Sequence, residues 1–336
     1  MIRLILIAFA YVALAISSAD AQNRDVYTIH GIAVDERAPT VGEAQQKAFA
    51  SAKLIGAQQL IERFTLPEDR AAATDLIIDQ TLADRIAAAV DVEEEVAGAG
   101  RYRGSLAVVY NPTQLRLVLN QVGLPFSDSL GPKAVLFSTS SNRMDLAWNL
   151  AWDESPKNSL VPLLISRSSG YRPDTDWSVL QDEIALYGAQ RAIFANLRGG
   201  QGGYLVDLVS VTASGTRTIG TTRRAPTLSG AIDAVADLLN SDWKRSSIVR
   251  DSSRTLIEAT VRYTSLAEWN TLRGALVRSP LVSNFQTRAI STDGAFIAFA
   301  FAGDGQRLTS DLRDRGVVIN AEDIGWVMTS AISAGR

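Results

Sequence analysis

The chain has 336 residues, and its 33 Lys and Arg against 36 Asp and Glu give a formal net charge of −3. A nucleic-acid binder needs a clustered basic surface, so this balance argues against that class. The lack of cysteine excludes disulfides, thiolate metal sites and a cysteine nucleophile. An apolar content of 46% argues against a disordered chain and predicts packed cores.

Residues 1–21 have the pattern of a cleavable secretory signal. Arg3 precedes an apolar run over 4–16, and Ala19-x-Ala21 is the small-x-small pattern that signal peptidase cuts. The run is shorter than the roughly 20 residues that span a bilayer. A retained amino-terminal anchor, which shares most of these features, is the alternative. We expect a soluble periplasmic protein that begins at Gln22 and has no further membrane span.

Residues 22–123 predict a β-α-α-β-β-α domain. Thr40 and Glu43 form a capping box before a long alanine-rich helix that ends ahead of Pro67. Asn111 followed by proline predicts the start of the last helix, because asparagine caps helices and proline suits the first helical position. The other expected elements are strands over 26–34, 90–96 and 102–110 and a helix over 78–89.

Residues 124–132, rich in Pro, Ser and Gly, predict a linker. Residues 133–245 then predict an α/β domain. Asp174 is the expected cap of a helix that Gly188 ends, and Trp148 and Trp152 flank another helix. The expected strands cover 134–138, 160–165, 192–197, 204–211 and 216–221, and a last helix carries residues 228–239.

Residues 251–336 predict a ferredoxin-like β-α-β-β-α-β domain. Ser265-x-x-Glu268 forms a second capping box, and the Asp293-Gly294 pair predicts a hairpin turn. The fold class predicted for the whole chain is therefore α+β, with three small α/β sandwich domains in tandem.

Five motifs in the first domain resemble one known family. They are YTIHGIAVD at 27–35, LIERF at 60–64, VEEEV at 92–96, RYRGSL at 101–106 and YNP at 110–112. Together they resemble the exported bacterial family known as domain of unknown function 2066. That family has no assigned activity, so the resemblance implies no catalytic residue.

The middle segment carries a second resemblance. GYLVDLV at 203–209 and the later alanine-rich helix are similar to the amino-terminal domain of TolB. Such a domain after the first one resembles the architecture of flagellar assembly protein T. This resemblance implies a periplasmic, non-enzymatic assembly role.

His30 is the single histidine, so a serine triad or a histidine-based metal site would have to use it. No Gly-x-Ser-x-Gly elbow accompanies it, and a half-buried strand residue is the interpretation that we favour. Glu93, Glu94 and Glu95 offer oxygen ligands for a cation such as Ca²⁺. Successive strand side chains point to opposite faces, so only Glu93 and Glu95 could converge, and a solvated strand is favoured.

Other candidate sites also have simpler interpretations. The run RGGQGG at 198–203 suggests a phosphate loop, but a strand follows it where phosphate binding needs a helix, so a hairpin turn is expected. The acid pairs at 153–154 and 182–183 are candidates for glycoside hydrolysis, but nothing in their spacing distinguishes them from other acidic residues. Two basic groups, Arg217 with Arg223 and Arg224, and Lys244 with Arg245 and Arg250, could bind anionic lipid or a peptidoglycan carboxylate; solvated surface is expected.

The six tryptophans complete the candidates. Trp177, Trp243, Trp269 and Trp326 fit core positions. Trp148 and Trp152, four residues apart, could form an exposed aromatic shelf for a glycan or partner, although core packing is favoured.

The sequence assigns no catalytic, cofactor-binding or metal-binding residue. The function that we expect is a non-catalytic periplasmic interaction or assembly module with an envelope protein or complex as partner, no nucleic acid and no cofactor. The alternatives are a hydrolase of an envelope polymer and a periplasmic protein that binds a small ligand or a metal. A cluster of buried acids would favour the hydrolase, a closed apolar pocket would favour the ligand-binding protein, and an exposed sheet edge or apolar groove would favour the interaction module.

Overall fold

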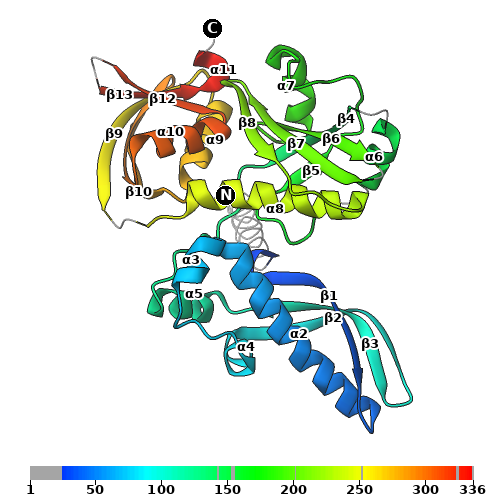
Figure 1. Ribbon diagram of the computed structural model, residues 1–336. Coiled ribbons are helices and arrows are strands. Elements are labelled where there is room, and N and C mark those ends of the chain that lie inside the picture. Colours follow the sequence, from blue (N-terminus) through cyan, green and yellow to red (C-terminus); the bar gives the residue numbers. More distant parts are fainter. Residues whose placement is uncertain are drawn as a thin grey trace, which may run out of the picture. The chain divides into compact units, whose positions relative to one another are not determined.

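The computed structural model describes residues 25–141, 144–152, 156–200, 202–250, 253–322 and 325–334 (Figure 1). The chain divides into two compact units, Met1–Asp128 and Ser129–Arg336. Unit 1 holds one sheet and unit 2 holds two, so the predicted α+β class is confirmed. The expected secretory signal lies outside the described residues. Among the described helices, none has both the length and the apolar content required to cross a bilayer.

Unit 1 is a three-stranded antiparallel sheet, in the order β1-β3-β2, with a long helix on one face. Thr40 accepts a hydrogen bond from the Glu43 amide, and the Glu43 carboxylate accepts one from the Thr40 amide, which confirms the predicted capping box. The elements are β1 (Thr28–Arg37), α2 (Val41–Phe64), α3 (Pro67–Ala72), α4 (Gln80–Ile86), β2 (Ala87–Gly98), β3 (Arg101–Tyr110) and α5 (Pro112–Gln121).

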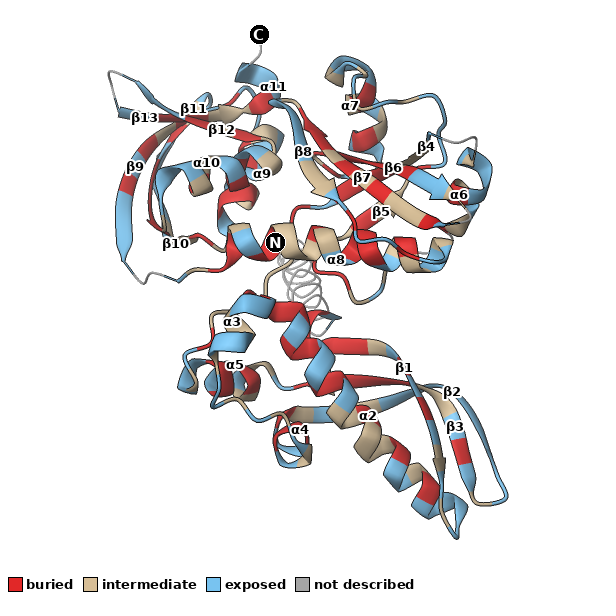
Figure 2. Ribbon diagram, in the orientation of Figure 1, coloured by how far each residue is buried: buried red, intermediate tan, exposed pale blue. Residues whose placement is uncertain are grey.

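Small residues let α2 approach the sheet closely. Ala44, Ala48 and Ala52 are fully buried, and at Gly56 an added Cβ would lie 2.4 Å from the Tyr110 hydroxyl oxygen. That hydroxyl donates a 2.7 Å hydrogen bond to the carbonyl of Lys53, so the ring is fixed against the helix. In Figure 2 the buried residues of α2 recur along the helix, interrupted by exposed ones.

The helix predicted over 78–89 is shorter than expected. Asp79 accepts from the Leu82 amide at 2.8 Å and starts α4, which ends at Ile86. The alanines at 87–89 belong to β2, because pairing with β3 at Tyr110 outweighs their helix propensity. At the end of the unit, Asn111 caps α5 as predicted, accepting from two amides.

The first sheet of unit 2 has the order β5-β4-β6-β7-β8, with β5, β4 and β6 parallel and β7 and β8 antiparallel. The strand before and the strand after α7 lie on opposite sides of β4, so the chain crosses over β4 at that point. The elements are β4 (Ala134–Ser140), α6 (Asp145–Ala151), β5 (Leu163–Ile165), α7 (Trp177–Leu186), β6 (Ala192–Gly200), β7 (Gly203–Thr212), β8 (Gly215–Thr221) and α8 (Leu228–Ser247).

The second sheet of unit 2 has the order β10-β11-β9-β13-β12. A ferredoxin-like fold would place β12 beside β9. Instead β12 and β13 form a hairpin, and β13 lies parallel to β9 with Trp326 opposite Ala259. The elements are β9 (Arg254–Arg262), α9 (Leu266–Val277), β10 (Val282–Ile290), β11 (Gly294–Ala302), α10 (Gly305–Asp314), β12 (Val317–Glu322), β13 (Gly325–Ser330) and α11 (Ala331–Ala334).

The second predicted capping box is present in a modified form. Ser265 accepts from the Glu268 amide at 3.2 Å, as the sequence predicts. The Glu268 carboxylate, however, accepts from the amide of Thr264, one residue earlier than the cap. The helix start is therefore the expected one, while the reciprocal bond is shifted by one residue.

A group of ion pairs joins elements of unit 2. The Arg191 side chain is only 5% exposed, and its Nη1 lies 3.6 Å from Asp314 Oδ2 at the end of α10. Arg217 of β8 also lies 3.6 Å from Asp314 and pairs with Asp242 of α8 at 3.0 Å. Because these groups come from both halves of the unit, ion pairs link the two predicted segments 133–245 and 251–336.

Candidate functional site

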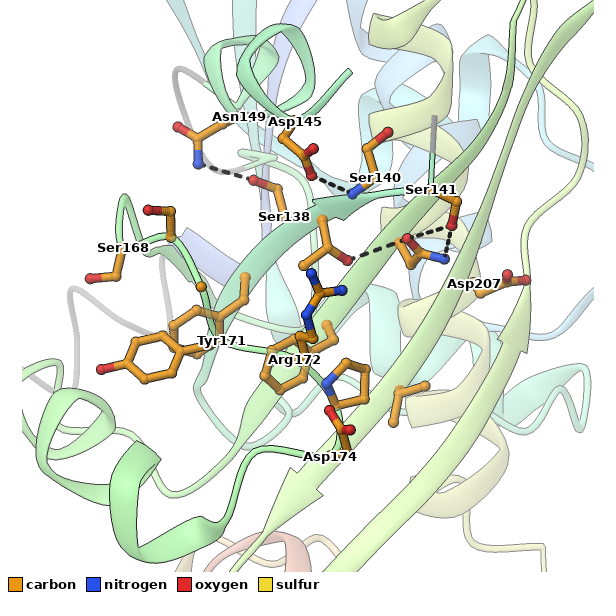
Figure 3. A pocket seen from close by; sticks show the side chains of 18 of the residues that line it. Ser138, Ser140, Ser141, Asp145, Asn149, Ser168, Tyr171, Arg172, Asp174 and Asp207 are labelled. Carbon is orange, nitrogen blue, oxygen red and sulfur yellow. Dashed lines mark hydrogen bonds between the residues drawn. The ribbon is translucent and has the colours of Figure 1, made fainter. Parts of the chain in front are cut away.

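A cavity of about 900 Å³ lies where strand β4 of unit 2 ends (Figure 3). We call it the strand-end cavity; its lining comes from the end of β4, the start of α6, the β5–α7 loop and the facing part of β6 and β7. Ligands of open α/β sheets bind outside the carboxyl ends of the strands, where neighbouring connections leave in opposite directions. The chain leaves β4 toward β5 and leaves β6 toward β7, so this cavity occupies that position.

The floor of the cavity is a polar row that crosses the sheet. Thr139, Asn196 and Asp207 are directly paired neighbours on β4, β6 and β7. One step earlier on the same face, Phe137 and Phe194 stack with ring centroids 5.2 Å apart in the buried core. Side chains two residues apart share a face of a strand. The same face therefore changes from core to polar floor within one period of the strand.

Hydrogen bonds hold this floor in place. Asn196 donates to Ser141 Oγ at 2.9 Å, and the Thr139 hydroxyl lies 3.5 Å from Asn196 Oδ1. Arg198 donates to Asp207 at 2.7 Å, and the Thr221 hydroxyl donates to the same oxygen at 2.6 Å. The Asp207 carboxylate is thus neutralised by protein groups.

Helix α6 supplies one wall. Asp145 accepts from the Ser140 amide at 2.8 Å, and Asn149 donates to Ser138 Oγ at 3.1 Å. At the other end of the helix, Arg167 donates to the carbonyls of Asn149 and Trp152, at 2.5 and 2.7 Å. A cation at a helix carboxyl terminus is favourable, so Arg167 has a structural role here.

The β5–α7 loop supplies the other wall and is itself well anchored. The Tyr171 ring packs edge-on against Phe137, 5.2 Å between centroids. A turn with Pro173 at its second position follows, closed by the Thr175 amide donating to Arg172 O at 2.9 Å and the Arg172 amide donating to Thr175 Oγ1 at 2.8 Å. Burial and the Glu183 carboxylate raise the pKa of Tyr171, so its hydroxyl stays protonated at neutral pH.

Two charged side chains of this loop, Arg172 and Asp174, are available to a ligand. Within the described part of the chain, neither the Arg172 guanidinium nor the Asp174 carboxylate makes an ion pair or a side-chain hydrogen bond. The sequence predicted Asp174 as a helix cap, which is wrong: Asp176 caps α7, accepting from the Ser178 amide at 3.0 Å. Figure 3 shows the Arg172 side chain extending into the cavity, with Asp174 at its border.

The predicted candidates of unit 1 occupy ordinary structural positions. His30 is a half-buried strand residue, as favoured, and its Nδ1 lies 2.9 Å from Glu93 Oε1. Glu93 also accepts from Ser105 at 2.9 Å, whereas Glu95 accepts from the Tyr102 hydroxyl. Among the described residues no group of carboxylates or histidines is arranged to hold a metal ion.

All three side chains of the first basic group bond to other protein groups. Arg217 pairs with Asp242, Arg223 pairs with Asp237, and Arg224 donates to the Gly202 carbonyl. Lys244 is only 6% exposed, so the solvated position expected for it is wrong. Strands β6 and β7 pair antiparallel up to Gly200 and Gly203, which confirms a hairpin in place of a phosphate loop.

Of the candidate acid pairs, the structure describes 182–183, and this pair does not line the strand-end cavity. Asp182 and Glu183 lie on α7 beside a separate hollow of about 540 Å³. Glu183 accepts a hydrogen bond from Ser166. Residues 153–154 fall outside the described residues.

The aromatic shelf is contradicted by the structure. Trp148 and Trp152 are both fully buried and pack edge-on, 5.2 Å between centroids. Trp243 and Trp269 are buried as predicted. Trp326, the second residue of β13, is 39% exposed.

No local motif marked the strand-end cavity. The available signal was the polar run that follows each of two predicted strands, STSS at 138–141 and SRSSGYRPD at 166–174. A comparison of the chain with protein-family models and with curated proteins gives no match.

Proposed function

We propose that this chain is a non-catalytic binding protein of the bacterial cell envelope, and that its second unit holds a small polar ligand in the strand-end cavity. The observation that carries the proposal is a cavity of about 900 Å³ at the carboxyl ends of parallel strands, floored by a fixed row of one hydroxyl, one amide and one carboxylate group. Its volume lies within the range typical of small-molecule sites, roughly 300–1,000 Å³.

The bonding of the cavity's polar groups favours binding over hydrolysis. The hydroxyls of Ser138 and Ser141 accept from the side-chain amides of Asn149 and Asn196, and a nucleophilic serine needs a general base. The single histidine of the sequence is His30, which belongs to unit 1. Two of the three lining acids are engaged, Asp145 by the Ser140 amide at the end of β4 and Asp207 in an ion pair with Arg198.

The envelope location rests on the amino-terminal pattern and on the two resemblances. Mass spectrometry of the protein from a periplasmic fraction tests it. The proposal expects an intact chain that begins at Gln22. A chain in the membrane fraction that retains residue 1 would establish the anchor alternative.

The cavity is tested with ligand-observed NMR on the full chain. The probes are glucose, glucuronate, L-alanyl-L-alanine, citrate and inorganic phosphate at millimolar concentration. We expect at least one probe to bind, and Ser169→Trp to abolish that binding, because Ser169 lines the cavity and is exposed. The matched control is Ser214→Trp in the exposed β7–β8 turn. Binding of no probe, or loss in both variants, would reject the cavity as a binding site.

A further inference from the structure

The charges around the strand-end cavity point to the class of its ligand; this inference rests on the binding function proposed above. Five charged side chains line the cavity: Arg167, Arg172, Asp145, Asp174 and Asp207. Three of them are already used by the protein. Arg167 binds the end of α6, Asp145 binds the Ser140 amide at the end of β4, and Asp207 is paired with Arg198. What remains is one cation and one anion.

We propose that the strand-end cavity binds a zwitterion, a free amino acid or short peptide whose carboxylate contacts Arg172 and whose ammonium group contacts Asp174. Arginine presents a planar fork of donors that matches a carboxylate, and aspartate accepts from an ammonium group. The hydroxyl and amide groups of the floor then face the peptide bonds and the polar side chains of the ligand.

The geometry of the loop favours a ligand with both charges over one with a single charge. Arg172 and Asp174 flank Pro173 in one closed turn, so the two charges are held as a unit at the border of the cavity. A simple anion at Arg172 would be repelled by the Asp174 carboxylate nearby, and a simple cation at Asp174 would be repelled by Arg172. A zwitterion satisfies both groups without leaving either charge unpaired.

The loop that carries the two charges is anchored on both sides. Tyr171 packs on Phe137 immediately before Arg172, and Asp176 caps α7 immediately after the turn. Gly170 has a φ of 99°, a conformation that favours glycine, so the chain turns sharply into the anchored segment. A loop fixed in this way presents its charges in one arrangement and loses little entropy when a ligand binds.

The test uses L-alanyl-L-alanine, its N-acetyl derivative and its carboxyl-terminal amide, titrated against the full chain by calorimetry or ligand-observed NMR. Each derivative removes one of the two charges. We expect either derivative to bind about tenfold more weakly than the dipeptide, which corresponds to about 1.4 kcal/mol.

The variants remove the same charges from the protein. Arg172→Gln and Asp174→Asn should each weaken dipeptide binding about tenfold, and Arg172→Gln should make the dipeptide and its amide bind alike. The matched control is Arg288→Gln, an exposed arginine of β10 outside the cavity, which should leave binding unchanged.

The possible failures are distinguishable. If glucose or citrate binds and Ser169→Trp blocks it, while the dipeptide does not bind or its derivatives bind equally well, the zwitterion proposal is wrong and the binding function stands. If no probe binds, both proposals fail.

Discussion

The tight packing of Gly56 against Tyr110 gives a sharp test of the core of unit 1. At Gly56 in α2, a Cβ would lie 2.4 Å from Tyr110 Oη and 2.8 Å from Ile32 Cδ1. Alanine is otherwise the better helix former, so without this contact Gly56→Ala would stabilise the unit by about 1 kcal/mol. We expect the opposite, because the ring of Tyr110 cannot move without losing its hydrogen bond to the Lys53 carbonyl.

The expected size follows from three contributions. Overpacking a tight core costs roughly 1–3 kcal/mol. Breaking the hydrogen bond from Tyr110 and leaving its hydroxyl unsatisfied costs roughly 1–3 kcal/mol. Against these stands the helix-propensity gain of about 1 kcal/mol. Gly56→Ala should therefore lower the free energy of unfolding by about 3 kcal/mol, and the midpoint of unit 1 by roughly 10–20 °C.

The tryptophans make the assay specific. The first tryptophan is Trp148, so fluorescence reports unit 2, while far-ultraviolet circular dichroism reports both units. The control is Gly42→Ala in the same helix, where the new Cβ meets nothing within 4 Å. Replacing Tyr110 with Phe in the Gly56→Ala background removes the contacting oxygen and should restore part of the loss. Equal stability of the Gly56→Ala and Gly42→Ala proteins would refute the argument.

Two further predictions concern unit 2. Desolvation raises the pKa of Glu268, but hydrogen bonds from Ser330, Thr264 and Ser333 together lower it to about 2, against an ordinary value of 4.5. As the pH falls, the Glu268 carboxylate is therefore protonated in the unfolded chain before it is protonated in the folded one. The free energy of unfolding should fall as the pH drops from 4.5 to about 2. Urea denaturation across this range should show a smaller decrease of that free energy in Glu268→Gln. Arg167→Ala removes the donor to two carbonyls at the end of α6 and should destabilise unit 2 by about 1–2 kcal/mol in thermal unfolding, and an unchanged midpoint would contradict that role.

Local signals predicted most elements of this fold. The caps at Thr40, Asn111 and Ser265 are where the sequence places them, because a cap depends on residues within one turn. Predictions that depended on distant partners were weaker. Trp326 looked like a core residue, but its strand is paired so that the side chain is 39% exposed.

The strand-end cavity shows why a site can escape prediction from a sequence whose strands are largely predicted. The alternation at 135, 137 and 139 indicates a strand face that ends in a threonine. Strand pairing places this threonine beside Asn196, and Asn196 beside Asp207. The threonine and Asn196 are more than 50 residues apart in the sequence, so local patterns do not show that they are neighbours. Likewise Asp174 could be recognised as uncommitted only once Asp176 was seen to cap α7. The residues that define the site are therefore those left over when helix caps and ion pairs have taken their partners.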